Sequence, residues 1–313
     1  MKGRELRIIF MGTPEFAEAS LRELCVNGYN VVAAVTMPDK PAGRGLKIQQ
    51  SAVKKYAVEQ GLTVLQPEKL KDADFIAELQ SYNADLFIVV AFRMLPEVVW
   101  AMPRLGTFNL HASLLPQYRG AAPINRAIMN GDTVTGVTTF FLNHKIDEGA
   151  IIGREEVEIS AEDNAGTLHD KLMEVGKTLI INTIEKIAEG NFEPIPQEDI
   201  PVEELRNAPK IFKDECKVDF NKKGAEIINF IRGLSPYPAA WSELGDITFK
   251  IFEATYEPDN QTGICGEISS DGRNYLKISC KDGYINITDL QLSSRKRMKT
   301  QDLLRGFKIE QYI

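Results

Sequence analysis

Residues Leu6–Met37 read LRIIFMGTPEFAEASLRELCVNGYNVVAAVTM, and this stretch decides the fold class. Leu6–Gly12 is an apolar run that ends in glycine, as a buried strand does, and Thr13-Pro14 then offers a helix N-cap followed by a first-turn proline. Asn30–Met37 is a second apolar run of strand length. The order strand, helix, strand predicts a parallel sheet.

A dinucleotide-binding fold is the first alternative for such an opening. Its fingerprint places three glycines at GxGxxG spacing after the first strand, so that a pyrophosphate can approach the backbone. Here Gly12 is followed by Thr13, Pro14 and Glu15, with no further glycine. The sequence therefore disfavours a nicotinamide or flavin site.

Strand and helix patterns alternate as far as residue 190. Further strands are predicted at 62–65, 85–92, 108–111 and 136–142, and helices at 51–60, 72–82, 96–101, 123–130 and 167–189. The run at 85–92, DLFIVVAF, is apolar throughout, as a central parallel strand should be. We predict an α/β catalytic domain over residues 1–190, built on a doubly wound, mostly parallel, Rossmann-like sheet.

The rest of the chain has a different composition. Residues 191–208 are rich in proline and poor in apolar side chains, which predicts a semi-rigid linker. A short helix at 224–232 then precedes β-rich sequence, with Asp271-Gly272 and Asp282-Gly283 as hairpin turns. Strands are predicted at 247–256, 275–280 and 284–290. Residues 209–313 are expected to form a small β-barrel of the oligonucleotide-binding (OB) type.

The charge is unevenly distributed along the chain. The net charge of the whole chain is −7, which argues against a nucleic-acid partner. Residues 209–313, however, contain 16 Lys and Arg against 15 Asp and Glu, a net charge of +1. Residues 1–208 contain 21 against 29, a net charge of −8. The acidity therefore lies in the first part, and the second part could present a basic face.

The cysteines and the apolar runs indicate a compartment. The four cysteines form no CxxC pair and have no histidine at metal-ligand spacing, so we expect neither a zinc site nor a disulfide framework. The apolar run near the N-terminus is too short for a signal peptide, and no run of about 20 apolar residues occurs. A cytoplasmic protein without membrane contact is expected.

The strongest candidate for a functional site is Gly106–Arg126, GTFNLHASLLPQYRGAAPINR. Strand residues two apart point to the same side, so Asn109 and His111 project together at the start of a loop restricted by prolines. An amide and an imidazole directed at one point can hold a carbonyl and stabilise the oxyanion that forms when a nucleophile attacks it. The alternative is a pair of polar groups with a structural role.

A carboxylate from a neighbouring loop could orient the imidazole, or a water molecule, for proton transfer. Asp147 is the best candidate because its turn directly follows a predicted strand, although it could also be an ordinary turn residue. A Ser/His/Asp hydrolase centred on Ser113 is disfavoured, since no GxSxG elbow surrounds Ser113. We interpret the other histidines, His144 and His169, as structural or solvent-facing.

Two basic segments need an explanation. Pro38–Gln50, PDKPAGRGLKIQQ, is a long loop, and loops of this length in compact domains are usually functional or mobile. A second charge run near the C-terminus consists of Arg295, Lys296, Arg297 and Lys299. Each segment could be a solvated surface. In an RNA-binding protein, both would contact phosphates.

Asn109–Ile124, NLHASLLPQYRGAAPI, resembles the signature of the folate-dependent formyltransferases. The likeness covers nearly the whole chain, through MGTPEFA at 11–17, DKPAGRG at 39–45, SPYPAAW at 235–241 and the basic ending at 295–306. The resemblance implies formyl transfer from 10-formyltetrahydrofolate, and it is greatest to the members that formylate initiator methionyl-tRNA. Glycinamide ribonucleotide formyltransferases lack a comparable tail, and amino-sugar formyltransferases are the nearest rival.

The resemblance also implies roles for individual residues. The catalytic residues would be Asn109, His111 and Asp147. The folate site would be lined by Ser113, Leu114, Leu115 and Pro116. The tRNA would be contacted by Lys40 and Arg44 of the insertion loop and, near the C-terminus, by Arg295, Lys296 and Arg297. A monomer that needs no metal is expected.

One departure from the family pattern concerns the catalytic turn. The family reads D-x-G-D there, whereas this chain has Asp147-Glu148-Gly149-Ala150, so the second carboxylate is absent.

Two rival functions remain open at this point. An amino-sugar formyltransferase would keep the catalytic trio without needing the basic loop. A non-catalytic RNA-binding protein is disfavoured because the trio is intact.

Overall fold

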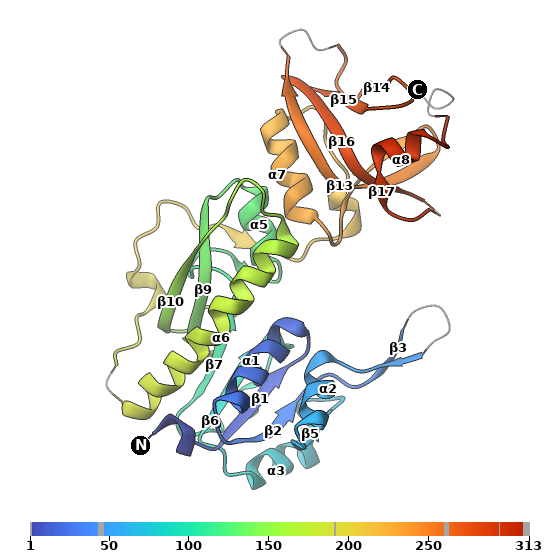
Figure 1. Cartoon of the computed structure of the whole chain (residues 1–313). Coiled ribbons are helices and arrows are strands. Elements are labelled where there is room, and N and C mark those ends of the chain that lie inside the picture. The colour runs from blue at the N-terminus through green and yellow to red at the C-terminus, as the bar shows by residue number, and fades with distance from the viewer. Residues whose placement is uncertain (1, 43–46, 191, 260–262, 294, 309–313) are drawn as a thin grey trace. The chain divides into compact units, whose positions relative to one another are not determined.

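A computed structural model describes residues 2–42, 47–190, 192–259, 263–293 and 295–308 (Figure 1). Over these residues the fold divides into two compact units. The first unit consists of Met1–Gly120, Thr135–Val157 and Asp170–Asn207, and the second of Ala121–Val134, Glu158–His169 and Ala208–Ile313. Because the second unit includes two segments from within residues 1–190, the predicted division at 190 and 208 stays a prediction.

The first unit is built on one mostly parallel sheet. In spatial order its strands are β10 (Ile151–Glu158), β9 (Val134–Phe141), β7 (Thr107–His111), β6 (Leu86–Val90), β1 (Ile8–Gly12), β2 (Val31–Val35) and β5 (Val64–Leu65). Neighbouring strands from β7 to β5 pair in parallel, whereas β9 pairs antiparallel to β7. The predicted Rossmann-like sheet is confirmed, but β10 was not predicted.

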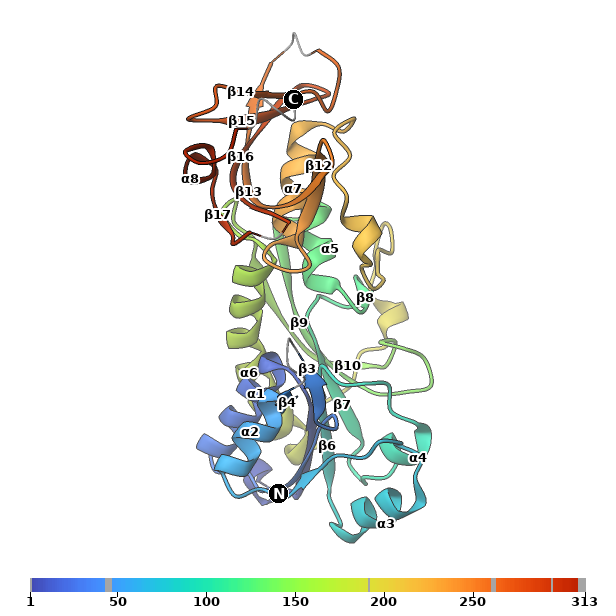
Figure 2. The same ribbon diagram turned by 90° about the vertical axis from the view of Figure 1, so that its right-hand side faces the viewer.

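Helices cover both faces of this sheet. They are α1 (Glu15–Val26), α2 (Ala52–Glu59), α3 (Ala73–Ser81), α4 (Glu97–Trp100) and α6 (Ala165–Glu189). Figure 2 shows α1, α2 and α6 on one side of the strands and α3 and α4 on the other. Side chains that alternate along β1, Ile9 and Met11, share one buried cluster with Phe75 of α3 and Val99 of α4. This arrangement is the doubly wound one that the alternating strands and helices predict.

The start of α1 differs from the prediction. Pro14, not Thr13, occupies the N-cap position, and no side chain caps the helix. An N-cap side chain reaches the N–H groups two or three residues further on, and Thr13 lies one residue too early for this. In the described part of the chain, its buried Oγ1 has no hydrogen-bond partner.

The basic loop at Pro38–Gln50 contains a short β-ribbon. Strand β3 (Lys40–Ala42) pairs antiparallel with β4 (Lys47–Gln49), with Lys40 opposite Gln49. At its base, the carboxylate of Asp39 accepts a hydrogen bond from Lys54 Nζ at 2.6 Å. The predicted loop is therefore anchored where it leaves the sheet.

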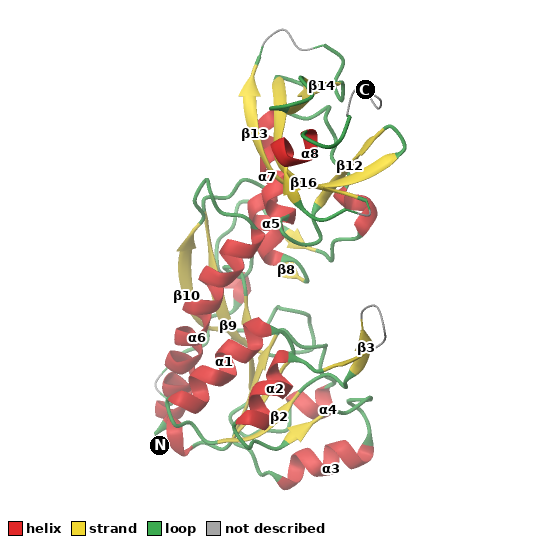
Figure 3. Ribbon diagram, turned by 45° about the vertical axis from the view of Figure 1, so that its right-hand side comes forward, coloured by secondary structure: helices red, strands yellow, loops and turns green. Residues whose placement is uncertain are grey.

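The second unit contains a curled antiparallel sheet. In spatial order its strands are β12 (Ala240–Leu244), β13 (Ile247–Pro258), β16 (Gly283–Leu292), β15 (Leu276–Cys280) and β14 (Ile268–Ser270), and β17 (Met298–Lys299) pairs with β16. Figure 3 shows this sheet curling around α7. The predicted strands at 247–256, 275–280 and 284–290 are confirmed, as is the OB type of the domain. The short strands β12, β14 and β17 were not predicted.

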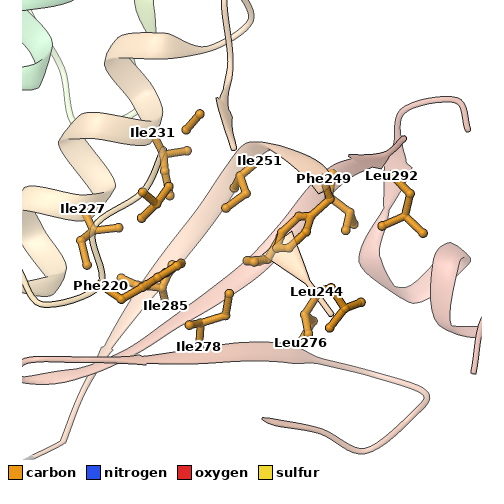
Figure 4. Close-up of a cluster of buried hydrophobic side chains, with 14 of the residues drawn as sticks. Phe220, Ile227, Ile231, Leu244, Phe249, Ile251, Leu276, Ile278, Ile285 and Leu292 are labelled. Atoms are coloured by element: carbon orange, nitrogen blue, oxygen red, sulfur yellow. The ribbon is translucent and has the colours of Figure 1, made fainter. Parts of the chain in front are cut away.

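The core of the second unit joins this sheet to its helices. The helices are α5 (Pro123–Met129), α7 (Gly224–Leu234) and α8 (Thr300–Leu304). Ile227 and Ile231 of α7 point at Phe249 and Ile251 of β13 and at Ile285 of β16, and all are at most 1% exposed (Figure 4). Burying this apolar surface stabilises the curl of the sheet.

The remaining elements are short. They are η1 (Gly3–Glu5), β8 (Arg119–Gly120), η2 (Gln197–Asp199), β11 (Asn207–Ala208) and η3 (Lys213–Cys216). Two of them, η2 and β11, lie within the predicted linker. In the described residues, no helix has the length and apolarity that crossing a membrane would require.

Candidate active site

Strand β7 brings Asn109 and His111 to the same face of the sheet. Asn109 is in register with Val89 of β6, and Val89 belongs to the cluster on the side of α3 and α4. Leu110 points the other way, toward α6, where a side chain on Gly176 would meet Leu110 Cδ2 at 2.8 Å. The shared face predicted from the strand period therefore follows from the register.

The amide of Asn109 has an unusual feature. Its Oδ1 is buried, yet within the described part of the chain this oxygen has no hydrogen-bond partner. Most buried polar atoms in proteins are hydrogen-bonded, because an unpaired one keeps its full desolvation cost. Asn109 Oδ1 is thus a buried acceptor on this face of β7 whose hydrogen-bonding capacity the described residues leave unused.

The imidazole of His111 is 8% exposed, and the backbone fixes its orientation. Its Nε2 lies 2.9 Å from the carbonyl oxygen of Tyr118. A carbonyl oxygen can only accept, so Nε2 carries a proton and donates it. In the neutral ring, Nδ1 is consequently the nitrogen that can accept a proton from a substrate.

The predicted folate segment, Ser113–Pro116, is mostly buried. Ser113 and Leu115 are both 0% exposed, and the Ser113 hydroxyl donates to the Gln117 carbonyl at 2.6 Å. Thr138 of β9 holds the loop, because its hydroxyl donates to the Ser113 carbonyl and accepts from the Leu115 N–H. Only Leu114 of the four is partly exposed, so any contact through an exposed side chain would come from Leu114.

Asp147 lies in the turn between β9 and β10. Its Oδ2 accepts a hydrogen bond of 3.0 Å from the Gly120 N–H of β8. No hydrogen bond joins Asp147 to His111 in the described residues. The His111 imidazole contacts the Tyr118 carbonyl instead, and the role of Asp147 in orienting the imidazole or a water molecule stays a prediction.

The turn itself is tightly constrained. Asp147 has φ of 55°, a left-handed conformation that is uncommon outside glycine. A side chain on Gly149 would place Cβ 1.6 Å from the carbonyl oxygen of Phe141, so only glycine fits there. Ala150, which replaces the family's second Asp, accepts the Phe141 N–H through its carbonyl oxygen at 3.0 Å. Its backbone therefore continues the pairing of β9 with β10.

A residue that the sequence did not single out lies behind this turn. Gln197 of η2 is 3% exposed, and its amide contacts both the turn of Asp147 and the side chain of Arg119. Sequence patterns assigned Gln197 to a linker because no apolar period surrounds it. Prolines lie near both Gln197 and Arg119 in the sequence, and the restricted backbone that they imply was the one signal that could have pointed to these residues.

The predicted tRNA-contact residues are placed as follows. Lys40 is exposed on β3, whereas Arg44 lies outside the described residues. Lys296 is exposed, as is Arg295, whose guanidinium lies 5.3 Å from the centroid of the Phe307 ring. Arg297 forms a salt bridge within the fold, since its Nε lies 2.8 Å from Asp289 Oδ1.

The family of the chain follows from its similarity to known proteins. The family model described as "Formyl transferase" matches residues 6–184, and "Formyl transferase, C-terminal domain" matches residues 210–308. A protein of Bacteroides fragilis named methionyl-tRNA formyltransferase is 57% identical over 313 residues, or 98% of this chain and 97% of the relative. One of Flavobacterium johnsoniae with the same name is 54% identical, over 96% of each chain. The chain belongs to the methionyl-tRNA formyltransferase family.

Solved structures show the same fold at low identity. The sugar 3N-formyl transferase WlaRD, determined with dTDP and 5-N-formyl-THF, is 21% identical, with a TM-score of 0.66 and coverage of 93% of this chain and 99% of that one. HypX from Aquifex aeolicus in complex with tetrahydrofolic acid is 19% identical, with a TM-score of 0.62, and the match covers 96% of this chain and 47% of HypX. These similarities bear on the fold alone.

Proposed function

We propose that the chain transfers the formyl group of 10-formyltetrahydrofolate to the free α-amino group of initiator methionyl-tRNA, giving N-formylmethionyl-tRNA for translation initiation. The relatives named methionyl-tRNA formyltransferase support this, since the matches cover 97% and 96% of their length. One structural observation carries the chemistry: the side-chain amide of Asn109 lies on the same face of β7 as the His111 imidazole, so that the Nδ2 donors of Asn109 and the imidazole can act on one carbonyl. Such a pair suits the attack of an amine on a carbonyl.

The proposed reaction proceeds by addition and elimination. The amine nitrogen forms a bond to the formyl carbon, and the oxyanion of the tetrahedral intermediate accepts hydrogen bonds from the Asn109 amide and from Nδ1–H of protonated His111. The bond from the formyl carbon to folate N10 then breaks, and the proton released by the amine goes to N10. Asp147, whose Oδ2 accepts a hydrogen bond from the Gly120 N–H, assists this proton transfer.

The binding assignments belong to the same proposal. Folate binds beside Ser113–Pro116, with partly exposed Leu114 as the contacting side chain and the buried Ser113 and Leu115 shaping the backbone. No metal takes part in the proposed steps; in the described residues no group of three His, Cys, Asp or Glu side chains is arranged to hold an ion. The chain is proposed to act as a monomer, and the three proposed catalytic residues, Asn109, His111 and Asp147, all belong to one compact unit. The reaction takes place in the cytoplasm, with translation.

The function is tested by formylation of three acceptors side by side: initiator methionyl-tRNA, elongator methionyl-tRNA and an amino-sugar nucleotide, each with 10-formyltetrahydrofolate. We expect N-formylmethionyl-tRNA from the initiator at a kcat/KM at least ~100-fold above the other two. Preferred formylation of the amino-sugar nucleotide would replace the proposal with a sugar formyltransferase. Binding of tRNA without any formyl transfer would indicate a non-catalytic RNA-binding protein.

Contacts to the tRNA backbone should make catalysis sensitive to salt. We propose that Lys40, Arg44, Lys296, Arg295 and Arg297 contact phosphates. Counterion release makes such affinity fall with salt, and each lost contact lowers the slope of log K against log salt by roughly one. Arg44→Ala should therefore lower kcat/KM for tRNA by about 10-fold while changing the KM for folate by less than about 2-fold.

The matched control removes an equal charge from another surface. Arg22 of α1 is 54% exposed and pairs with Glu18 of its own helix, so Arg22→Ala should leave both constants nearly unchanged. The measurement is steady-state kinetics at several salt concentrations. A KM for tRNA that does not change with salt would contradict the phosphate contacts.

A further inference from the structure

We propose that Gln197 is a positioning residue, which holds the turn of Asp147 in the geometry that formyl transfer requires. This inference rests on the proposed function, because it gives Gln197 a role only through Asp147. It assigns a functional role to a segment that sequence composition alone describes as a linker. All the groups involved belong to the first compact unit.

The side-chain amide of Gln197 uses its full hydrogen-bonding capacity. Its Nε2 donates to the carbonyl oxygens of Asp147 and of Gly149, both at 2.8 Å. Its Oε1 accepts from Arg119 Nε at 3.0 Å and Nη2 at 2.6 Å. A primary amide offers two donors and two acceptor positions, and here all four are used. At 3% exposure, water can hardly substitute for them.

The two carbonyls belong to the strained residue of the turn and to Gly149, two residues further on. Asp147 is held at φ of 55°, and a strained backbone persists only where its surroundings determine it. The donors of Gln197 bind the peptide oxygens on either side of Glu148, so they clamp the turn from the inside. Gly149 adds a second restriction, because any side chain there would collide with the Phe141 carbonyl.

Strand β8 closes the arrangement into a ring. Arg119 of β8 binds Gln197 and also places Nη1 3.3 Å from Glu148 Oε1. The next residue, Gly120, donates its N–H to Asp147 Oδ2 at 3.0 Å. The same short strand thus holds the carboxylate through Gly120 and the turn through Arg119 and Gln197. Loss of the Gln197 amide would release the turn from β8 on one side and shift the carboxylate.

The direct test is Gln197→Leu, which keeps a similar volume and removes all four hydrogen bonds. Misplacing a reacting group by about 1 Å can slow an enzyme by roughly 100-fold. We expect kcat to fall by about 10- to 100-fold, while the KM values for folate and for tRNA change by less than about 3-fold. Gln197→Glu directs a carboxylate at the two carbonyls and should likewise lower kcat with little change in the two KM values. It serves as the test if Gln197→Leu fails to fold.

Gln117→Leu is the matched control. The Gln117 amide ties the same two segments together, since it donates to the Glu204 carbonyl at 2.7 Å and accepts from the Arg206 N–H at 2.8 Å. It makes no hydrogen bond to the turn of Asp147 in the described residues. If tethering in general mattered, Gln117→Leu would lower kcat as much as Gln197→Leu does. We expect its kcat to stay within about 3-fold of the unmodified chain.

A double-mutant cycle with Asp147→Asn separates positioning from general structural damage. If Gln197 acts through Asp147, adding Gln197→Leu to Asp147→Asn should lower kcat by less than about 3-fold further. Multiplicative losses, or normal kcat in Gln197→Leu and Gln197→Glu, would overturn the inference and leave the proposed function in place. Near-normal turnover of Asp147→Asn would instead remove Asp147 from the proposed mechanism, and the positioning role of Gln197 with it.

Discussion

The variant His111→Gln should lower kcat by about 1,000-fold, within the range that general acid–base groups contribute. Gln can still donate an N–H to the Tyr118 carbonyl, which His111 Nε2 contacts at 2.9 Å. It cannot carry a positive charge, and it has no group that gives up or accepts a proton near neutral pH. Both the stabilisation of the oxyanion and the proton transfer should therefore suffer, while folate binding stays nearly unchanged.

Single-turnover formylation and folate titration measure the two effects separately. The control is His144→Gln, because the His144 side chain is 71% exposed in the same turn as Asp147 and meets the edge of Trp100. We expect less than about 2-fold change in kcat for that variant. If His111→Gln weakened folate binding and left the single-turnover rate intact, the imidazole would be a binding group, and the proposed chemistry would be wrong.

Replacing Asn109 by Ala should lower kcat by about 100-fold or more. Loss of one oxyanion donor usually costs about 3 kcal/mol of transition-state stabilisation. The truncation removes a side chain whose buried Oδ1 has no partner in the described part of the chain, so few interactions within the fold are lost. Folate affinity and thermal stability should accordingly change little, which distinguishes this variant from a core truncation.

The isosteric variant Asn109→Asp sharpens the test. It keeps the shape of the side chain but removes the N–H donors and brings a negative charge toward the oxyanion. We therefore expect a larger loss of kcat than in Asn109→Ala. Asn221→Ala, which removes an exposed amide from the second unit, is the control and should keep its kcat. Near-normal turnover of Asn109→Ala would exclude the assigned role.

The pairing of Asn109 with His111 was predictable because it depends only on the strand period. In a strand, residues two apart share a face whatever the neighbouring strands are. The register with β6 then adds which face this is, the side of α3 and α4. Asp147 was proposed from its place after a predicted strand. Its hydrogen bond to the Gly120 N–H required the fold.

Other features could not be predicted because the sequence near them has no distinctive period. The pattern around Gln197 is that of a proline-rich connection, yet its amide is buried behind the turn of Asp147. The charge run near the C-terminus suggested free cations, whereas Arg297 pairs with Asp289 eight residues earlier along the chain. Both contacts join residues that are separated in the sequence and that only the folding of the chain brings together.

The sequence by itself determined most strands and helices of the α/β unit, the β-rich nature of the C-terminal unit and the face shared by Asn109 and His111. These depend on local periods of two or 3.6 residues and on turn chemistry. Only the tertiary structure decided which nitrogen of His111 donates to a backbone carbonyl, how the carboxylate of Asp147 is held and that Gln197 binds the turn of Asp147. Each depends on hydrogen bonds to backbone groups or between segments far apart in the chain, and neither kind of contact leaves a local pattern.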